Sequence, residues 1–300
     1  MKFIQTLLAG ALCLAPVFLS AADIAVSNGD KIAFLGDSIT QLGNSNKYGY
    51  LHLVISGLKT AGIDAVAVPA GISGHKSSNM LARVDRDVIA KKPQWMLLSC
   101  GVNDVWHGKN GVGLEDYKKN ITEICDKAEK AGIRIMILTA TMIYEDPDND
   151  RNKKLVAYND FLRDLAAKRK YLLADLNADM QALVAVKPDK KANALTVDGV
   201  HMNIAGNKMM AKGILKAFGV PAEKFAEIEK AWDNIPGTVP VFVETRVHLS
   251  SGCGVYVVSR KDYPLSIAEY NQLGAKAKEA GKPLGQYIFD NQDSLPQVKK

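Results

Sequence analysis

Four short polar segments carry the residue types that acyl transfer from an ester to water requires. They are residues 36–40 (GDSIT), 71–75 (GISGH), 101–104 (GVND) and 198–201 (DGVH). A serine hydroxyl is a weak nucleophile until a base takes its proton, and Ser38 and His201 supply that pair. Asp198, three residues before the histidine, can bond the other imidazole nitrogen and stabilise the imidazolium.

The same segments offer donors for the negative charge that develops on an attacked carbonyl oxygen. Gly74 can present its backbone N–H without side-chain obstruction, and Asn103 offers a side-chain amide. Together with the N–H of Ser38, these groups would form an oxyanion hole with three donors. Such chemistry requires no metal and no organic cofactor.

Each segment also has a purely structural interpretation. Gly-Asp-Ser is a common turn, and Asn103 and Asp104 can bond their own backbone. Residues 198–201 can form an Asx turn and the N-cap of the last helix. The order of the segments, and their position after successive strands, favours the catalytic interpretation.

Four further residues near these segments are candidate substrate contacts. Asp37 either positions the serine loop through backbone hydrogen bonds or caps it while facing solvent. Trp106 is either a stacking platform for a sugar or an aromatic residue on the core. For His75 and His107, substrate contacts at the rim of the site are a better interpretation than a metal centre, because the sequence shows no third ligand at a suitable spacing. Residues 144–146 follow a strand at the same edge and have no assigned role.

The elements that must position these residues alternate along the chain. The expected strands are 31–35, 65–69, 94–100, 134–139 and 171–176. The expected helices are 50–61, 77–91, 115–131, 152–169 and 204–218. Near-continuous apolar strands are typical of parallel strands that are covered on both faces. The alternation predicts an α/β fold whose parallel sheet lies between helices, and ligands bind such sheets beyond the carboxyl ends of the strands.

In order and content, the four segments resemble the first, second, third and fifth blocks of the SGNH (GDSL-type) hydrolase family. The resemblance covers about residues 30–218 and extends to bacterial secreted carbohydrate O-acetylesterases. It implies a flavodoxin-like three-layer α/β/α sandwich with five parallel strands in the order 2-1-3-4-5. It also implies that Ser38, His201 and Asp198 form a catalytic triad, and that Ser38, Gly74 and Asn103 form the oxyanion hole.

The first residues indicate a targeting segment. A positive start is followed by an apolar run at 7–19 and by small residues up to Ala22. This pattern is typical of a secretory signal peptide, here residues 1–22 with cleavage near Ala22. The apolar run is shorter than the roughly 20 residues that span a bilayer. We therefore expect a periplasmic or secreted protein without integral membrane association.

Composition excludes several classes of protein. With 47% hydrophobic and 23% charged residues, the chain is typical of a soluble globular protein. Its 38 basic residues are scattered among 32 acidic ones, which argues against nucleic acid as a partner. Cys100, Cys125 and Cys253 form neither a disulfide framework nor a zinc motif. Buried thiols, with at most one bridge, are the simplest interpretation.

Domain boundaries follow from these motifs. Residues 23–234 are expected to form the hydrolase domain and residues 235–300 a C-terminal accessory segment. In that segment, 239–249 and 255–259 predict a hairpin, and a capping box predicts a helix over 266–280. An isolated hairpin is marginal in water, so it should pack on the main domain, on a partner subunit or along a substrate channel.

The loops at the expected site favour a polar substrate. Residues 44–47 and 145–148 are rich in Asn, Lys, Asp and Glu. Polar walls suit a small-molecule or glycan ester, above all an O-acetylated carbohydrate. The alternatives are a short-chain carboxylesterase or lysophospholipase of the same family, or a glycan-binding protein without activity. The sequence sets neither the natural ester nor the oligomeric state.

Overall fold

The computed structural model describes residues 24–187, 193–235, 239–248, 254–263, 265, 267–282 and 284–291. The predicted signal peptide, residues 1–22, and Cys253 lie outside the described residues. Within the described ranges, no helix combines the length and the apolar character that crossing a membrane requires.

Five parallel strands form the central sheet in the order β2-β1-β3-β4-β5, which confirms the predicted topology. The strands are β1 (Lys31–Gly36), β2 (Val66–Gly71), β3 (Trp95–Ser99), β4 (Arg134–Leu138) and β5 (Leu172–Ala174). Leu35 of β1 pairs with Ala70 on one side and with Leu98 on the other. The three strands therefore end at the same level, and the segments that follow them start side by side.

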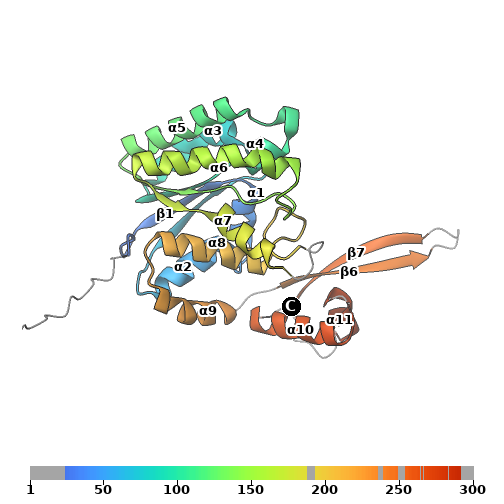
Figure 1. Cartoon of the computed structure of the whole chain (residues 1–300). Helices are drawn as coiled ribbons and strands as arrows, with labels where there is room; N and C mark the ends of the chain where they lie inside the picture. Colours follow the sequence, from blue (N-terminus) through green and yellow to red (C-terminus); the bar gives the residue numbers. More distant parts are fainter. Residues whose placement is uncertain are drawn as a thin grey trace, which may run out of the picture.

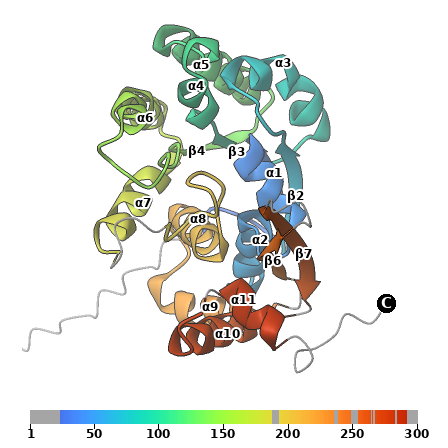
Figure 2. The same ribbon diagram turned by 90° about the vertical axis from the view of Figure 1, so that its right-hand side faces the viewer.

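Helices cover both faces of this sheet and produce three layers (Figure 1). One face carries α3 (Ser77–Asp87), α5 (Leu114–Lys130) and α6 (Asp150–Arg169). The other carries α2 (Tyr50–Thr60) and α8 (Ile204–Ala217), with α9 (Phe225–Asp233) packed against α2. Figure 2 shows the two helical layers from the end of the molecule. The three-layer α/β fold expected from the sequence is thus confirmed.

The core lies on both faces of the central strands. Phe34, Leu97 and Ile137 are fully buried and come from β1, β3 and β4. Tyr117 of α5 covers one face and Trp232 of α9 lies beyond the other, and both are also fully buried. Burying one such apolar side chain contributes about 1.5–3 kcal/mol. This packing fixes the strands, and with them the carboxyl edge of the sheet.

Three short helices begin where the sequence predicted loops or strand. They are α1 (Ser38–Ser45), α4 (Val102–Trp106) and α7 (Leu176–Ala185). Asp37 caps α1 by accepting the N–H of Ile39. Asp175 caps α7 in the same way, so β5 ends at Ala174 and the predicted strand to residue 176 is too long. Side-chain caps of this kind start helices that hydrophobic periodicity does not reveal.

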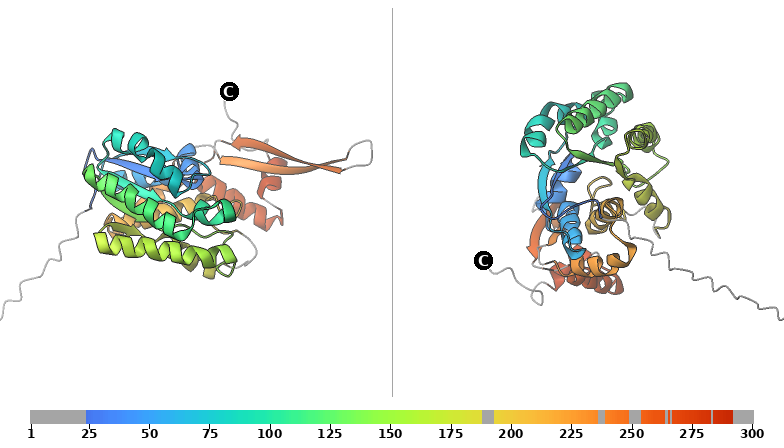
Figure 3. Two further views of the ribbon diagram at one scale, coloured as in Figure 1. Left: turned by 90° about the horizontal axis from the view of Figure 1, so that it is seen from above. Right: turned by 90° about the vertical axis from the view of Figure 1, so that its left-hand side faces the viewer.

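The C-terminal segment forms an antiparallel hairpin and two helices. The elements are β6 (Val239–His248), β7 (Gly254–Tyr263), α10 (Ile267–Glu279) and α11 (Leu284–Asp290). The predicted hairpin is confirmed with a longer second strand, whereas α11 was not predicted. The hairpin extends away from the three layers (Figure 3).

The two C-terminal helices contact the main body through a small apolar cluster. Tyr48, Leu265 and Ile288 are its buried members, and the hydroxyl of Tyr48 donates to the carbonyl oxygen of Leu265. Ile204, the first residue of α8, packs against this cluster. The division into a hydrolase domain, 23–234, and an accessory segment, 235–300, stays a prediction.

Candidate active site

A chain of hydrogen bonds joins three of the predicted site residues. Ser38 Oγ lies 2.9 Å from His201 Nε2, and His201 Nδ1 lies 2.6 Å from Asp198 Oδ2. When Nδ1 carries the imidazole proton and donates a hydrogen bond to the carboxylate, Nε2 is the nitrogen that can accept a proton from the serine. Ser38 opens α1 directly after β1, whereas Asp198 and His201 lie on the loop before α8.

The contacts of Asp198 fit both the structural and the catalytic interpretation of its segment. Its Oδ1 accepts the N–H groups of Val200 and His201, which is the Asx turn expected from the sequence. Its Oδ2 is the atom that faces the imidazole. Burial acts to raise the pKa of Asp198, but the hydrogen bonds from His201 and Val200 outweigh it and hold the pKa below its usual 3.8. The carboxylate is therefore ionised at neutral pH.

The second and third segments meet beside α1. Asn103 is buried, and its Nδ2 donates to the carbonyl oxygen of His75 at 3.1 Å. The N–H of Ser73 donates to Gln41 Oε1 of α1 at 2.7 Å. Between them, Gly74 adopts a φ of +75°, a conformation that favours glycine. The loop of Gly74 is thus held between the helix of Ser38 and the helix of Asn103.

Asp37 is neither exposed nor solvent-facing, so of the two interpretations for this residue the structure favours the positioning one. It is 2% exposed, and its Oδ1 accepts the N–H of Ile39 at 2.9 Å. Burial raises the pKa of Asp37 from 3.8 to about 6, the nearby Asp104 carboxyl adds to this, and the bond from Ile39 opposes it.

A buried arginine that the sequence analysis missed holds the same region. Arg83 of α3 is 4% exposed, and its guanidinium donates to Gly36 O and Ala70 O, each at 2.8 Å. Its Nε donates to His75 Nδ1 at 3.0 Å. One side chain thus connects the end of β1, the end of β2 and the loop of Gly74. An arginine on the face of a helix that also carries Met80 is the sequence signal that could have found it.

Asp104 is a second buried positioning residue. Its Oδ1 accepts the N–H and the hydroxyl of Ser77, at 3.0 and 2.6 Å. Burial raises the pKa of Asp104, and the bonds from Ser77 work in the opposite direction. The carboxylate connects α4 to the start of α3, so the helix of Asn103 is fixed relative to the helix of Arg83.

The remaining candidates are His75, His107 and Trp106. Burial, and then the neighbouring Arg83, lower the pKa of His75, while His107 is exposed at the end of α4. Trp106 packs partly against the core, and its ring lies edge-on to Tyr144 with 5.5 Å between centroids. Tyr144 is 42% exposed, so the pair of rings reaches the surface.

The described residues offer no candidate metal site, because no three His, Cys, Asp or Glu side chains among them gather suitably. Cys100 and Cys125 are free, buried thiols, and burial raises the pKa of both. Cys100 Sγ donates to Asp104 Oδ2 at 3.5 Å. These thiols are part of the core, as expected.

Comparison with known proteins gives a family and several relatives. The profile of the GDSL-like Lipase/Acylhydrolase family matches residues 34–209. A protein of Geobacillus stearothermophilus named acetylxylan esterase is 26% identical over 214 residues, which are 65% of this chain and 96% of that protein. Esterase TesA of Pseudomonas aeruginosa is 25% identical over 203 residues, 67% of this chain and 92% of that protein.

A solved structure adds to these relatives. The acetyl xylan esterase AlAXEase superposes with a TM-score of 0.57 at 33% sequence identity. The match covers 62% of this chain and 98% of that one. The similarity therefore spans almost the whole of the relatives.

Proposed function

The chain belongs to the GDSL-like lipase/acylhydrolase family and is a carboxylic ester hydrolase, and we propose that it is an exported serine esterase that deacetylates carbohydrates. The observation that carries the proposal is the hydrogen-bonded chain from Ser38 through His201 to Asp198. A serine, a base in contact with it and a carboxylate that orients the base form the arrangement that activates a hydroxyl nucleophile.

The first half of the proposed reaction transfers the acyl group to the enzyme. Ser38 Oγ attacks the ester carbonyl carbon while its proton passes to His201 Nε2. The C–O bond to the sugar then breaks, and the imidazolium returns that proton to the leaving alcohol. Asp198 keeps its negative charge throughout and stabilises the imidazolium.

The second half releases the acid. Water gives a proton to His201 Nε2 and attacks the acyl-enzyme carbonyl carbon. When the bond to Ser38 Oγ breaks, the proton on the imidazole returns to the serine. In both halves the oxyanion would accept hydrogen bonds from the N–H groups of Ser38 and Gly74 and from the amide of Asn103.

A carbohydrate acetyl ester is the substrate class we favour. Two of the relatives are named acetylxylan esterases, and polar loops such as residues 44–47 and 146–148 are partly or fully exposed, whereas Glu145 is buried. The rings of Trp106 and Tyr144 add an aromatic surface beside that edge. A short-chain carboxylesterase or lysophospholipase is the second candidate, and the exposed apolar side chains of Leu42 and Val197 favour it.

Export is part of the proposal. The support is the pattern of residues 1–22, in which a positive start, an apolar run and small residues stand in the order of a signal peptide. An esterase exported in this way meets acetylated glycans outside the cytoplasm.

Ser38→Ala tests the proposed function. We expect acetate release from acetylated oligosaccharides to fall by about four orders of magnitude or more, with the unfolding midpoint unchanged. The wild-type protein, unlike the variant, should react with a fluorophosphonate probe. Ser56→Ala, on α2 and outside the loops of the site, is the matched control and should keep full activity.

Two results would contradict parts of the proposal. Undiminished hydrolysis by Ser38→Ala would exclude the serine mechanism. A rate that rises from acetyl toward longer acyl esters would replace the carbohydrate substrate with the second candidate.

A further inference from the structure

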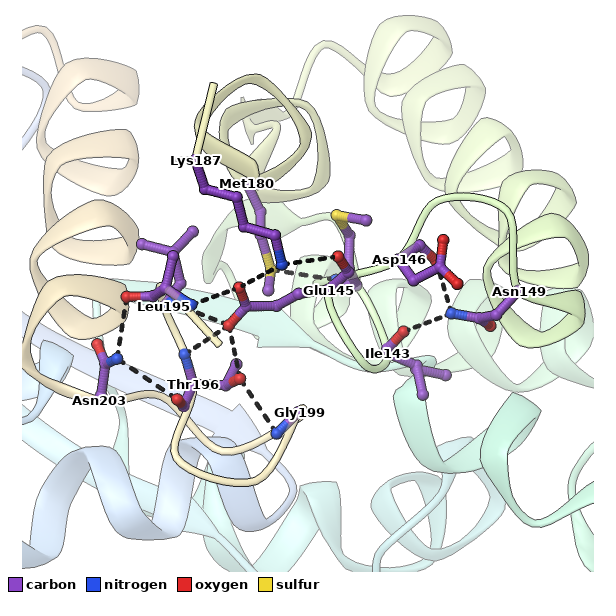
Figure 4. A network of polar contacts seen from close by, with 12 residues as sticks. Ile143, Glu145, Asp146, Asn149, Met180, Lys187, Leu195, Thr196, Gly199 and Asn203 are labelled. Carbon is purple, nitrogen blue, oxygen red and sulfur yellow. Dashed lines mark hydrogen bonds and ion pairs between the residues drawn. The ribbon is translucent and has the colours of Figure 1, made fainter. Parts of the chain in front are cut away.

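Glu145 is a buried carboxylate with no part in the mechanism above. It follows β4, is 2% exposed, and accepts hydrogen bonds from three consecutive backbone N–H groups (Figure 4). Oε2 accepts the N–H of Ala194 at 2.7 Å, and Oε1 accepts those of Leu195 and Thr196 at 2.9 and 2.8 Å. The hydroxyl of Thr196 also donates to Oε1, at 2.6 Å.

These contacts keep the carboxylate ionised. Burial by itself would raise the pKa of Glu145, but the bonds from the Thr196 hydroxyl and from the backbone of residues 194–196 outweigh it and lower the pKa below its usual 4.5. Lys187 Nζ adds an ion pair at 3.7 Å. A buried charge is stable only when donors surround it in this way.

The donors belong to the loop that carries Asp198 and His201. The hydroxyl of Thr196 accepts the N–H of Gly199 at 3.1 Å, so the contact of Glu145 continues to the middle of the loop. The N–H of Val197 donates to the carbonyl oxygen of His201 at 2.8 Å, and this bond closes the loop.

Asn203 binds the opposite side of the same loop. Its Nδ2 donates to the carbonyl oxygens of Ala194 and Thr196, at 3.0 and 3.4 Å. The backbone around Ala194 and Thr196 therefore donates to Glu145 and accepts from Asn203. Both faces of this stretch are fixed by side chains outside it.

The backbone before Glu145 is held in an unfavourable conformation. Tyr144 and Glu145 have φ values of +64° and +47°, which side-chain-bearing residues rarely adopt. The N–H of Tyr144 donates to Gly199 O at 2.6 Å, and a Cβ on Gly199 would lie 2.6 Å from Tyr144 Cδ1. Strain of this kind persists where surrounding contacts impose it, which is common next to functional sites.

We propose that Glu145 is the positioning residue of the loop that carries Asp198 and His201. Packing alone does not fix these two side chains, which are 49% and 26% exposed. Glu145 holds the base of the loop and, through Thr196, its middle, so that His201 Nε2 stays in contact with Ser38. The proposal rests on the proposed function, because positioning matters only if the triad does the chemistry.

The first test is Glu145→Gln, which keeps the shape and removes the charge and one acceptor oxygen. We expect kcat to fall about a hundredfold at nearly constant KM, because a displacement of about 1 Å of a reacting group costs that much. Hydrogen exchange of the amides of residues 194–196 and of Gly199 should accelerate. Asp175→Asn is the matched control. It also neutralises a hydrogen-bonded carboxylate, but one that caps α7 and does not contact the loop of His201, so kcat should be unchanged.

A double-mutant cycle separates positioning from a general loss of structure. In the background of Asp198→Asn, the loop no longer presents a functional carboxylate, so Glu145→Gln should cost much less than in the wild-type protein. If Glu145→Gln does not fold, Thr196→Val is the alternative. It removes only the hydroxyl that joins Glu145 to the N–H of Gly199, and it should lower kcat about tenfold.

The outcomes are distinguishable. A wild-type kcat in Glu145→Gln, or in Thr196→Val where the first variant does not fold, overturns the positioning role, whatever the exchange rates are. Full additivity with Asp198→Asn overturns it as well. If the wild-type protein shows no Ser38-dependent hydrolysis, the proposed function fails, while the exchange measurement still reports whether Glu145 holds the loop.

Discussion

The two halves of the candidate site are held in place by different means. Ser38, Gly74 and Asn103 follow β1, β2 and β3, three strands that are neighbours in the sheet. Asp198 and His201 lie between α7 and α8, and the described residues of that stretch contain no strand of the sheet. The register of the sheet therefore fixes the proposed nucleophile and the proposed oxyanion donors, whereas side-chain anchors must fix the proposed base.

The anchors on the two sides have opposite charge for a physical reason. The carboxyl ends of strands present carbonyl oxygens, and the guanidinium of Arg83 donates to two of them. The loop presents consecutive N–H groups, and the carboxylate of Glu145 accepts three of them. A buried charge on each side thus has the sign that suits the backbone groups it contacts there.

Among the changes that test this difference between the two sides, Arg83→Met should have the largest effect on stability and activity. It leaves the carbonyl oxygens of Gly36 and Ala70 without their charged donor, so the free energy of unfolding should fall by about 3 kcal/mol. Because both loops of the nucleophile side lose an anchor, kcat should fall about a hundredfold as well. Denaturant unfolding and ester hydrolysis measure the two effects.

Arg86→Met is the matched control for that prediction. Its side chain is 74% exposed, and its ion pair with Asp87 lies at the surface. Exposed pairs of this kind are screened by solvent and contribute little, so both stability and activity should stay close to the wild-type values. If Arg83→Met stays as close to the wild-type values as Arg86→Met, the sheet alone holds the nucleophile side without Arg83.

The sequence predicts the sheet side better than the loop side. The strands were predicted within a few residues, because long apolar runs identify buried parallel strands without knowledge of their neighbours. The short helices α1 and α4 were missed. The side chain of Asp37 caps α1, whereas α4 starts after Gly101 without a side-chain cap, and both helices are too short to show a clear hydrophobic period. Glu145 was assigned no role, because its partners lie about fifty positions further along the chain.

Asp37→Asn should change stability in the opposite direction from Arg83→Met. The folded-state pKa of Asp37 is raised from 3.8 to about 6, so stability decreases as the pH rises through this window. The variant lacks this ionisation, and Asn can still accept the N–H of Ile39. Well above pH 6 it should be more stable than the wild type by about 3 kcal/mol, a difference that vanishes below about pH 4.

The same substitution should lower kcat, because a neutral amide no longer favours the positive charge that forms on His201. Unfolding free energies measured from pH 4 to pH 8, together with kcat, test the prediction. Asp85→Asn, whose side chain is 64% exposed, is the control and should show no such pH dependence. A variant that is less stable than the wild type at every pH would mean that the negative charge of Asp37 is needed for folding.

Tyr144→Ala tests the contact between the sheet side and the loop side of the candidate site. The ring of Tyr144 lies against Trp106 from the sheet side, while its N–H binds Gly199 from the loop side. Removing the ring keeps the backbone bond and takes away an exposed aromatic surface that we expect to pack against a sugar ring. KM for acetylated oligosaccharides should rise about fivefold, which corresponds to about 1 kcal/mol of lost aromatic contact.

A second substrate without a sugar shows whether the ring of Tyr144 binds the sugar or supports the loop of His201. For p-nitrophenyl acetate, which carries no sugar, KM and kcat should stay at the wild-type values, and Tyr144→Phe should behave as wild type with both substrates. A fall in kcat for both substrates would show instead that the ring supports the loop of His201. In that case the loop side would depend on Tyr144 packing as well as on Glu145, and the contrast between a sheet-held nucleophile and a side-chain-held base would be stronger.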